Sequence, residues 1–399
     1  PMDDAGKVEP TKRRYDNNAV IECYKNLVAW AKTADEVGID TMWLTEHHFQ
    51  YEGYEVLPNL ILFGQHLTGQ TTNLRLGQMF NVVPQWHPLR LAEDFATLHN
   101  LSGGRGMLGV GRGTVPREIL HLNDFHISIG SHDNPEQAAD DTKNREYFEE
   151  QMEIIRMALT QERFKLDGKY FKVRGPINAP RSPQGRVPIC QAGGSPRGQA
   201  FAARWADTII TNAVSIEGMK SFREEVRRLA ASFGRDPDRI KVLFLAYPVI
   251  DTTMEAARER RRLEQEDAGR HLDLQLSGMS RLTNIDFSQF DLDEPLPPLT
   301  TNGHQSTLAK WIGKTPRSLA SGLTSRQGVD FGGTADHVAG LMQEIMQEVG
   351  GDGFLLFNAT FDRRYIMEVC DGLVPELQRR GLVRGQYAHK HLRDNLLEF

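Results

Sequence analysis

Two histidines and a glutamate, Glu46, His47 and His48, directly follow a short apolar and β-branched segment at residues 40–45. Such a segment is typical of a strand, so the three polar side chains leave from its carboxyl end. Histidine can donate or accept a proton near neutral pH, which suits this position to acid–base chemistry. A metal site is less well supported, because adjacent strand residues face opposite sides and no H-E-x-x-H pattern is present. The alternative without chemistry is a polar strand end with hydrogen-bonded histidines.

A glycine-rich segment at residues 109–114 offers a second site. Its glycines do not have the G-x-G-x-x-G spacing, so a Rossmann dinucleotide site is poorly supported. Glycines at a strand end let a flat ligand approach the backbone, and Arg112 supplies a fixed charge suited to bidentate phosphate binding. A tight turn carrying a surface arginine is the alternative.

A third segment, at residues 191–198, runs from a strand through two glycines into a helix. Ser195 stands at the N-cap and Pro196 at the first helical position. A helix N-terminus with unpaired amides is a ready phosphate site. Together with Arg112, this pattern favours a phosphate cradle over a merely well-capped helix. Its members are Gly193, Gly194, Ser195 and Gly198.

Alternating helices and strands position these groups. Seven strands are predicted, beginning near residues 40, 74, 106, 187, 208, 240 and 353. Alternation implies a parallel α/β sheet, because each crossover returns the chain in the same direction. An eight-stranded (β/α)8 barrel of the TIM type needs one more strand before the helix at 19–37, and residues 1–18 are loop-like. The fold is therefore an open sheet or a barrel whose first strand lies upstream of Pro1, and we favour the barrel.

Two stretches interrupt the alternation, at residues 117–142 and 270–333. Both are too long for ordinary connections and are interpreted as insertions into a single barrel domain spanning 1–399. In a barrel, insertions after the strands close over the active site, so the first is predicted to be a lid.

Composition excludes several function classes. The chain has 399 residues, 47 basic against 53 acidic, for a formal net charge of −6. This balance disfavours nucleic-acid binding and intrinsic disorder. The apolar run at 242–250 is too short to cross a membrane, and three dispersed cysteines with no C-x-x-C pair suggest a reduced, cytoplasmic protein without a structural metal.

Several motifs, in order along the chain, resemble those of the bacterial luciferase-like flavin monooxygenases. They are Glu46-His-His-Phe49, His87-Pro-Leu-Arg-Leu-Ala-Glu-Asp94 and Leu101-Ser-Gly-Gly-Arg-Gly-Met-Leu-Gly-Val-Gly-Arg-Gly113. The C-terminal third is similar to the nitrilotriacetate and dibenzothiophene-sulfone monooxygenase branch, as in Val374-Pro-Glu-Leu-Gln-Arg-Arg-Gly-Leu382. The resemblance covers nearly the whole chain.

The resemblance implies an eight-stranded barrel that binds FMN, usually as reduced FMN delivered by a separate reductase. It implies that His47 is catalytic with His48 beside it, and that Glu46 lies near the flavin ring. It places Arg112 and Ser195 on the flavin phosphate, and a non-prolyl cis peptide under the ring at Met79-Phe80. Gly111 stands where luciferase has a cysteine, and Gly194 where it has an acid, so light emission is not expected.

The expected function is a monooxygenase that uses reduced FMN and O2, through a flavin peroxide, to oxygenate a small organic substrate. A homodimer is expected from the resemblance. Two alternatives remain open: a deazaflavin-dependent hydride-transfer oxidoreductase of the same fold, and a non-enzymatic flavin-binding protein.

Overall fold

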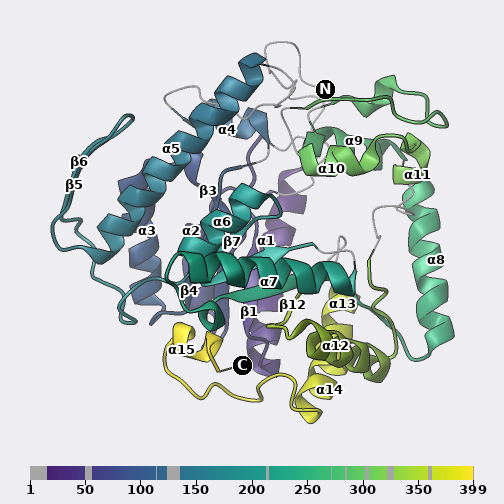
Figure 1. Ribbon diagram of the computed structural model, residues 1–399. Coiled ribbons are helices and arrows are strands. Elements are labelled where there is room, and N and C mark those ends of the chain that lie inside the picture. Colours follow the sequence, from purple (N-terminus) through teal and green to yellow (C-terminus); the bar gives the residue numbers. More distant parts are fainter. Residues whose placement is uncertain are drawn as a thin grey trace.

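The computed structural model of the chain describes residues 16–49, 56–113, 115–123, 135–212, 215–270, 272–283, 285–301, 305–320, 328–357 and 362–398. Its centre is a curled sheet of parallel strands with helices packed around the outside (Figure 1). No helix in the described ranges is long and apolar enough to cross a membrane.

The central sheet contains all seven strands predicted from the sequence. Its strands follow the order β1-β2-β4-β7-β8-β9-β12, every neighbouring pair is parallel, and a short β3 pairs with β4. The strands are β1 (Thr41–Leu44), β2 (Arg75–Gln78), β3 (Asn81–Val82), β4 (Gly106–Gly111), β7 (Ile189–Ala192), β8 (Thr208–Thr211), β9 (Lys241–Ala246) and β12 (Phe354–Leu356). All seven of the main strands therefore end at the same edge, where parallel α/β folds bind their ligands.

The helices that cover the sheet bury one apolar face each. Phe95 and Ile154 are fully buried in one core cluster between the sheet and two of these helices. Val226 and Val338 are fully buried in a second cluster, under two other helices. The covering helices are α1 (Asn17–Val37), α2 (Leu60–Thr68), α3 (Pro88–Leu101), α5 (Pro135–Thr160), α6 (Pro196–Trp205), α7 (Ile216–Ser232) and α12 (Ala335–Val349).

The strand expected at 74–82 is divided in two. The Met79-Phe80 peptide bond between β2 and β3 is cis, at the position the family resemblance implied. Gly109 on β4 lies against this break: a Cβ at Gly109 would collide with the Gln78 carbonyl oxygen. Only glycine fits this close backbone approach.

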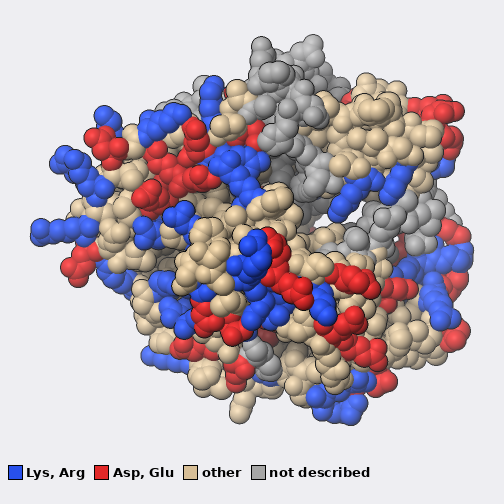
Figure 2. All heavy atoms as spheres, in the orientation of Figure 1, with Lys and Arg blue, Asp and Glu red and all other residues tan. Residues whose placement is uncertain are grey.

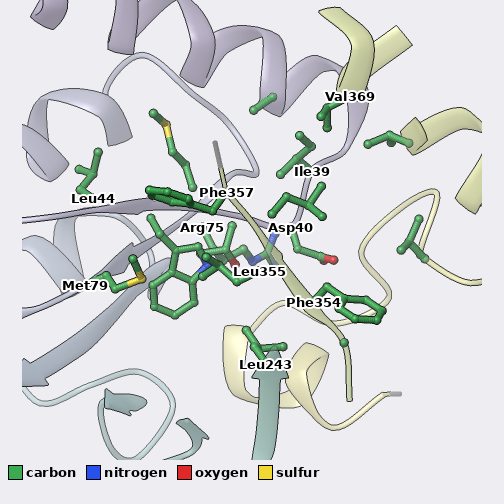
Figure 3. Close-up of a pocket in the computed structure, with 18 of the residues that line it drawn as sticks. Ile39, Asp40, Leu44, Arg75, Met79, Leu243, Phe354, Leu355, Phe357 and Val369 are labelled. Atoms are coloured by element: carbon green, nitrogen blue, oxygen red, sulfur yellow. The ribbon is translucent and has the colours of Figure 1, made fainter. Parts of the chain in front are cut away.

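β1 and β12 form the two ends of the sheet path and do not pair with each other among the described residues. Between them lies a cavity of about 1180 Å³, lined by Ile39, Leu44, Leu355 and Val369 and reaching Arg75 and Met79 (Figure 3). The sheet is thus a curled half-barrel rather than a closed ring in the described part of the chain.

Both predicted insertions contain more regular structure than expected. In the first, the short helix α4 (Pro116–Leu122) is followed by residues 124–134, which lie outside the described residues, and α5 begins at Pro135. Residues 135–142, predicted as part of a lid, therefore belong to a helix. The long helix was expected only from about 143, because its first turns are polar and lack an apolar stripe.

The second insertion is largely helical where it is described. Its helices α8 (Met254–Arg270), α9 (Leu272–Thr283), α10 (Gln305–Trp311) and α11 (Pro316–Ala320) form an arm beside the sheet (Figure 1). Phe287, Leu296 and Leu308 give this arm a small core of its own. The short strands β10 (Val249–Ile250) and β11 (Gly332–Gly333) pair at its base.

Two further differences concern local geometry. The antiparallel hairpin β5 (Lys165–Asp167) and β6 (Lys172–Arg174) was not predicted, because each strand is only three residues long. The helix expected at 362–380 consists of α13 (Arg363–Met367), a π-helical turn (Glu368–Leu373) and α14 (Val374–Arg379). Pro375 lacks a backbone N–H, which explains a break at this point.

A last short helix, α15 (Leu392–Leu396), packs against the barrel interior.

Candidate active site

The residues selected from the sequence leave four strands of the sheet at one edge. Glu46, His47 and His48 follow β1, Met79 and Phe80 follow β2, Arg112 follows β4, and Gly193 to Ser195 follow β7. β4 and β7 are neighbouring strands, and Val110 lies opposite Gln191. Arg112 and Gly193 each come two residues later, so they leave the two strands side by side. The candidate groups therefore line one side of the sheet's carboxyl edge.

Glu46 is the most deeply buried acid of the cluster, with 1% of its surface exposed. Its Oε1 lies 3.0 Å from His48 Nε2 and accepts a hydrogen bond from Trp86 Nε1 at 3.2 Å. Its Oε2 is buried and has no hydrogen-bond partner among the described residues. A carboxylate oxygen in this state is costly, which indicates that a bound group supplies the missing donor.

Burial raises the pKa of the Glu46 carboxyl, and the hydrogen bonds from His48 and Trp86 only partly oppose this effect. A carboxyl group with a raised pKa binds its proton more tightly in the folded than in the unfolded protein. The protonated Glu46 carboxyl therefore stabilises the folded protein at pH values below the ordinary pKa of glutamate. This stabilisation is lost as the pH rises through the pKa that Glu46 has in the folded protein.

We expect Glu46→Gln to stabilise the ligand-free protein progressively as pH rises from about 4 to about 7, by about 1 kcal/mol at the upper end. Urea unfolding of both proteins across this pH range measures the difference. Glu22→Gln, at an exposed carboxylate on α1, is the control and should show no such trend. A difference that stays constant or shrinks with pH would contradict the assignment of Glu46.

His47 is held from a different element. Its Nδ1 lies 3.2 Å from Oε1 of Glu118, a residue of α4 with 2% of its surface exposed. The backbone N–H of His47 donates to the Leu57 carbonyl oxygen at 3.2 Å. The two adjacent histidines thus contact two different buried carboxylates.

Arg112 is anchored on α5. Its Nη1 donates to Asp141 Oδ1 at 2.5 Å and to Asn144 Oδ1 at 3.1 Å, and among the described residues its hydrogen bonds use Nη1 alone. Burial would raise the pKa of Asp141, but Arg112 and Arg145 outweigh it and lower that pKa. Asp141 is therefore a fixed anion that orients Arg112, and the rest of the guanidinium can serve a ligand.

The segment after β7 has the predicted capping geometry. The Ser195 side chain accepts a hydrogen bond from Gly198 N at 3.2 Å, and Pro196 opens α6. Gly193 packs so closely on this turn that a Cβ would lie 2.8 Å from the Gly198 carbonyl carbon. A Cβ at Gly194 would meet nothing within 4 Å. The segment is a tight, backbone-lined turn with open space beside Gly194, as a phosphate cradle requires.

These two glycines make a matched pair for mutation. Gly193→Ala is expected to destabilise the protein by about 1–3 kcal/mol, because the new methyl group clashes with fixed backbone. Gly194→Ala should leave the thermal midpoint nearly unchanged. Calorimetry of the two variants measures both effects, and equal destabilisation would show that the turn is not built as described.

Some sequence candidates are brought together and others are not. His48 and Glu46 are in contact, and Trp86 donates to the same carboxylate. The next residue, His87, which begins one of the family motifs, packs edge-on against Phe171, with 5.6 Å between the ring centroids. Of the predicted site residues, Met79 alone lines the large cavity between β1 and β12. No group of three or more His, Cys, Asp or Glu side chains could hold a metal ion in the described part of the chain.

Comparison with known proteins decides the family. The sequence model of the luciferase-like monooxygenases matches residues 7–353. The chain belongs to the luciferase-like monooxygenase family. Its curated relatives include N-acetyl-S-(2-succino)cysteine monooxygenase of Bacillus subtilis (strain 168), 30% identical over 331 residues, 77% of this chain and 74% of the relative.

A second relative of this luciferase-like monooxygenase is dibenzothiophene-sulfone monooxygenase of Rhodococcus erythropolis. It is 28% identical over 357 residues, which cover 82% of this chain and 76% of the relative. Among solved structures, a riboflavin lyase with modified FMN and riboflavin superposes with a TM-score of 0.81 and 21% identity, over 97% of this chain and 91% of that one. This similarity establishes the luciferase-like barrel fold.

Sequence reasoning missed three residues at this monooxygenase's strand edge: Glu118, Asp141 and Asn144. Glu118 and Asp141 lie in the region 117–142 that was interpreted as a lid insertion, and Asn144 lies in the long helix predicted from about residue 143. Pro116 followed by Ile119 was a usable signal, since proline favours the first position of a helix and the isoleucine gives it a buried side. The polar start of α5 offered no comparable pattern.

Proposed function

We propose that this luciferase-like monooxygenase uses reduced FMN and O2 to oxygenate a small organic substrate, with the flavin supplied by a separate reductase. The observation that supports this most strongly is the arrangement at one strand edge. A phosphate-type cradle follows β7. A carboxylate–imidazole cluster follows β1, and one of its buried oxygens has no partner in the part of the chain that the structure describes. A long ligand with an anionic end and a polar ring fits this arrangement.

FMN fits the residues present. Ser195, the α6 N-terminal amides and Arg112 would hold its phosphate; Gly193 and Gly198 pack against each other to close the turn, and Gly194 leaves open space beside it. Arg112 and Arg145 share the single carboxylate of Asp141, and Arg197 pairs with Glu149, so three guanidinium groups lie near the turn. The Met79-Phe80 peptide would lie under the ring, held close to β4 because Gly109 and Gly111 leave space for Gln78 and Phe80.

The bound flavin would supply the capacity to activate O2, and the chain's own residues would control protons and water. His47 is suited to move a proton at the reacting centre. His48 would hold the Glu46 carboxylate, whose free Oε2 would accept a hydrogen bond from the ring. Exclusion of water by the segments that follow the strands would limit wasteful breakdown of the activated oxygen.

The wider arrangement belongs to the same proposal. The chain works as a single barrel domain with insertions at 117–142 and 270–333 that shape the substrate site, as a homodimer in the cytoplasm. In Figure 2, acidic and basic side chains are mixed over the visible face, which shows no extended basic surface of the kind that binds nucleic acid.

The test combines binding and turnover. Titration with FMN, reduced FMN and a deazaflavin coenzyme identifies the cofactor. O2 uptake with a flavin reductase, NADH and FMN is then measured over a panel of small thioethers, sulfones and amines, with 18O2 to trace the product. Substrate-dependent uptake with one labelled oxygen in the product is expected. Binding of the deazaflavin alone would instead favour hydride transfer, and flavin binding without turnover of any substrate would favour a carrier.

A further inference from the structure

Glu118 is a buried carboxylate that the proposed chemistry does not yet use. It lies in the first turn of α4, 71 residues after His47 in the chain, and its Oε1 is 3.2 Å from His47 Nδ1. A glutamate is rarely buried to this extent unless a partner or a function retains it.

The position of Glu118 is fixed by its neighbours. Ile119 is fully buried against Val82 of β3, and Val115 is also buried. The Glu118 backbone N–H donates to the Val115 carbonyl oxygen at 3.2 Å. Asn123 Nδ2 donates to the Ile119 carbonyl oxygen at 2.6 Å and ties down the end of the helix. α4 therefore presents the Glu118 carboxylate from a rigid support.

We propose that Glu118 is the positioning residue of His47, accepting a hydrogen bond from Nδ1–H and thereby leaving Nε2 as the basic nitrogen of the neutral ring. A carboxylate has no proton to give, so it selects the tautomer with hydrogen on Nδ1. Which nitrogen of a histidine reacts is set by the hydrogen bond that the other nitrogen makes.

The neighbouring histidine has the opposite arrangement. His48 uses Nε2 towards Glu46, so its outer nitrogen is Nδ1. Two adjacent histidines, each paired with its own buried acid through a different ring nitrogen, are thereby given distinct roles. The effect of Glu118 on catalysis rests on the proposed function of the protein. The tautomer of His47 does not, because it can be measured in the flavin-free protein.

The first test reads the tautomer directly. Long-range 1H–15N correlation spectra of 15N-histidine-labelled, flavin-free protein show which ring nitrogen is protonated, and His47→Asn assigns the His47 signals. We expect a proton on Nδ1 in the wild type, and its displacement towards Nε2 in Glu118→Leu. A wild-type ring protonated on Nε2, or the same tautomer in both proteins, would overturn the proposal.

Because Glu118→Leu could fail to fold, the near-isosteric Glu118→Gln is measured in parallel. An amide can donate as well as accept, so a mixture of the two tautomers is expected there. Asp352→Asn removes another carboxylate, whose side chain is 4% exposed and is bonded to Arg223 at the opposite edge of the sheet. It should lower stability and leave the His47 signals unchanged.

The second test asks whether Glu118 acts through His47. Glu118→Gln is expected to lower turnover at least tenfold in the wild-type background, but less than twofold in a His47→Asn background, with KM for reduced flavin unchanged. A purely structural role would reduce activity equally in both backgrounds and overturn the assignment. Failure of the flavin titration would reject the proposed function, while the tautomer result would still decide the pairing.

Discussion

Replacing His47 with asparagine is expected to lower the rate of substrate oxygenation by roughly 10²- to 10⁴-fold, the range typical of a lost general acid or base. Asparagine keeps a polar group of similar reach but cannot exchange a proton near neutral pH. The affinity for FMN should change less than about twofold, because no predicted phosphate contact is touched. Reductase-coupled turnover and equilibrium titration measure the two quantities separately.

His87 provides the matched control. It also lies at the carboxyl edge of the sheet, but it packs against Phe171 and makes no contact with the carboxylate cluster in the part of the chain that is described. His87→Asn should therefore retain turnover within a few-fold of the wild type. Equal losses in the two variants, or a parallel loss of flavin binding in His47→Asn, would argue against a chemical role for His47.

Replacing Arg112 with alanine is expected to weaken FMN binding by about 1.5–3 kcal/mol, the usual contribution of a hydrogen bond to a charged group. This corresponds to a dissociation constant raised roughly 10- to 150-fold. Loss of Arg112 also leaves Asp141 without one of its two arginine partners, which adds repulsion towards a phosphate. Fluorescence titration with FMN measures the change.

Arg223→Ala is the control for this prediction. Arg223 is also an arginine in a largely buried ion pair, with Asp352, but it lies at the opposite edge of the sheet. Its removal should lower stability and leave FMN affinity unchanged. If both variants bind FMN as the wild type does, the phosphate is held elsewhere.

The parallel sheet was predictable because its signals are local. Strand β1 is a compact apolar segment, and α6 carries both Ser195 at its N-cap and Pro196 at its first position. Such patterns depend on a few neighbouring residues. The same local patterns mark Glu46, His48 and the Ser195 turn as site residues.

What could not be predicted depends on contacts between distant segments. Glu118 meets His47 across 71 residues, and Arg112 meets Asp141 across 29. No local pattern marks these pairs: the sequence around Glu118 signals a short helix but not its partner, and Asp141 lies in the polar start of α5. The burial that raises the pKa of the Glu46 carboxyl likewise arises from packing rather than from its immediate sequence.

Two places in the described part of the chain could hold a flavin: the strand edge at Ser195 and Arg112, and the cavity of about 1180 Å³ between β1 and β12. A crystal structure of the protein with FMN distinguishes them. We expect a phosphate bonded to Ser195 and Arg112, with the ring over Met79-Phe80 and within reach of Glu46 Oε2. A phosphate bound away from Ser195 and Arg112, or a ring lodged in the β1–β12 cavity, would contradict it.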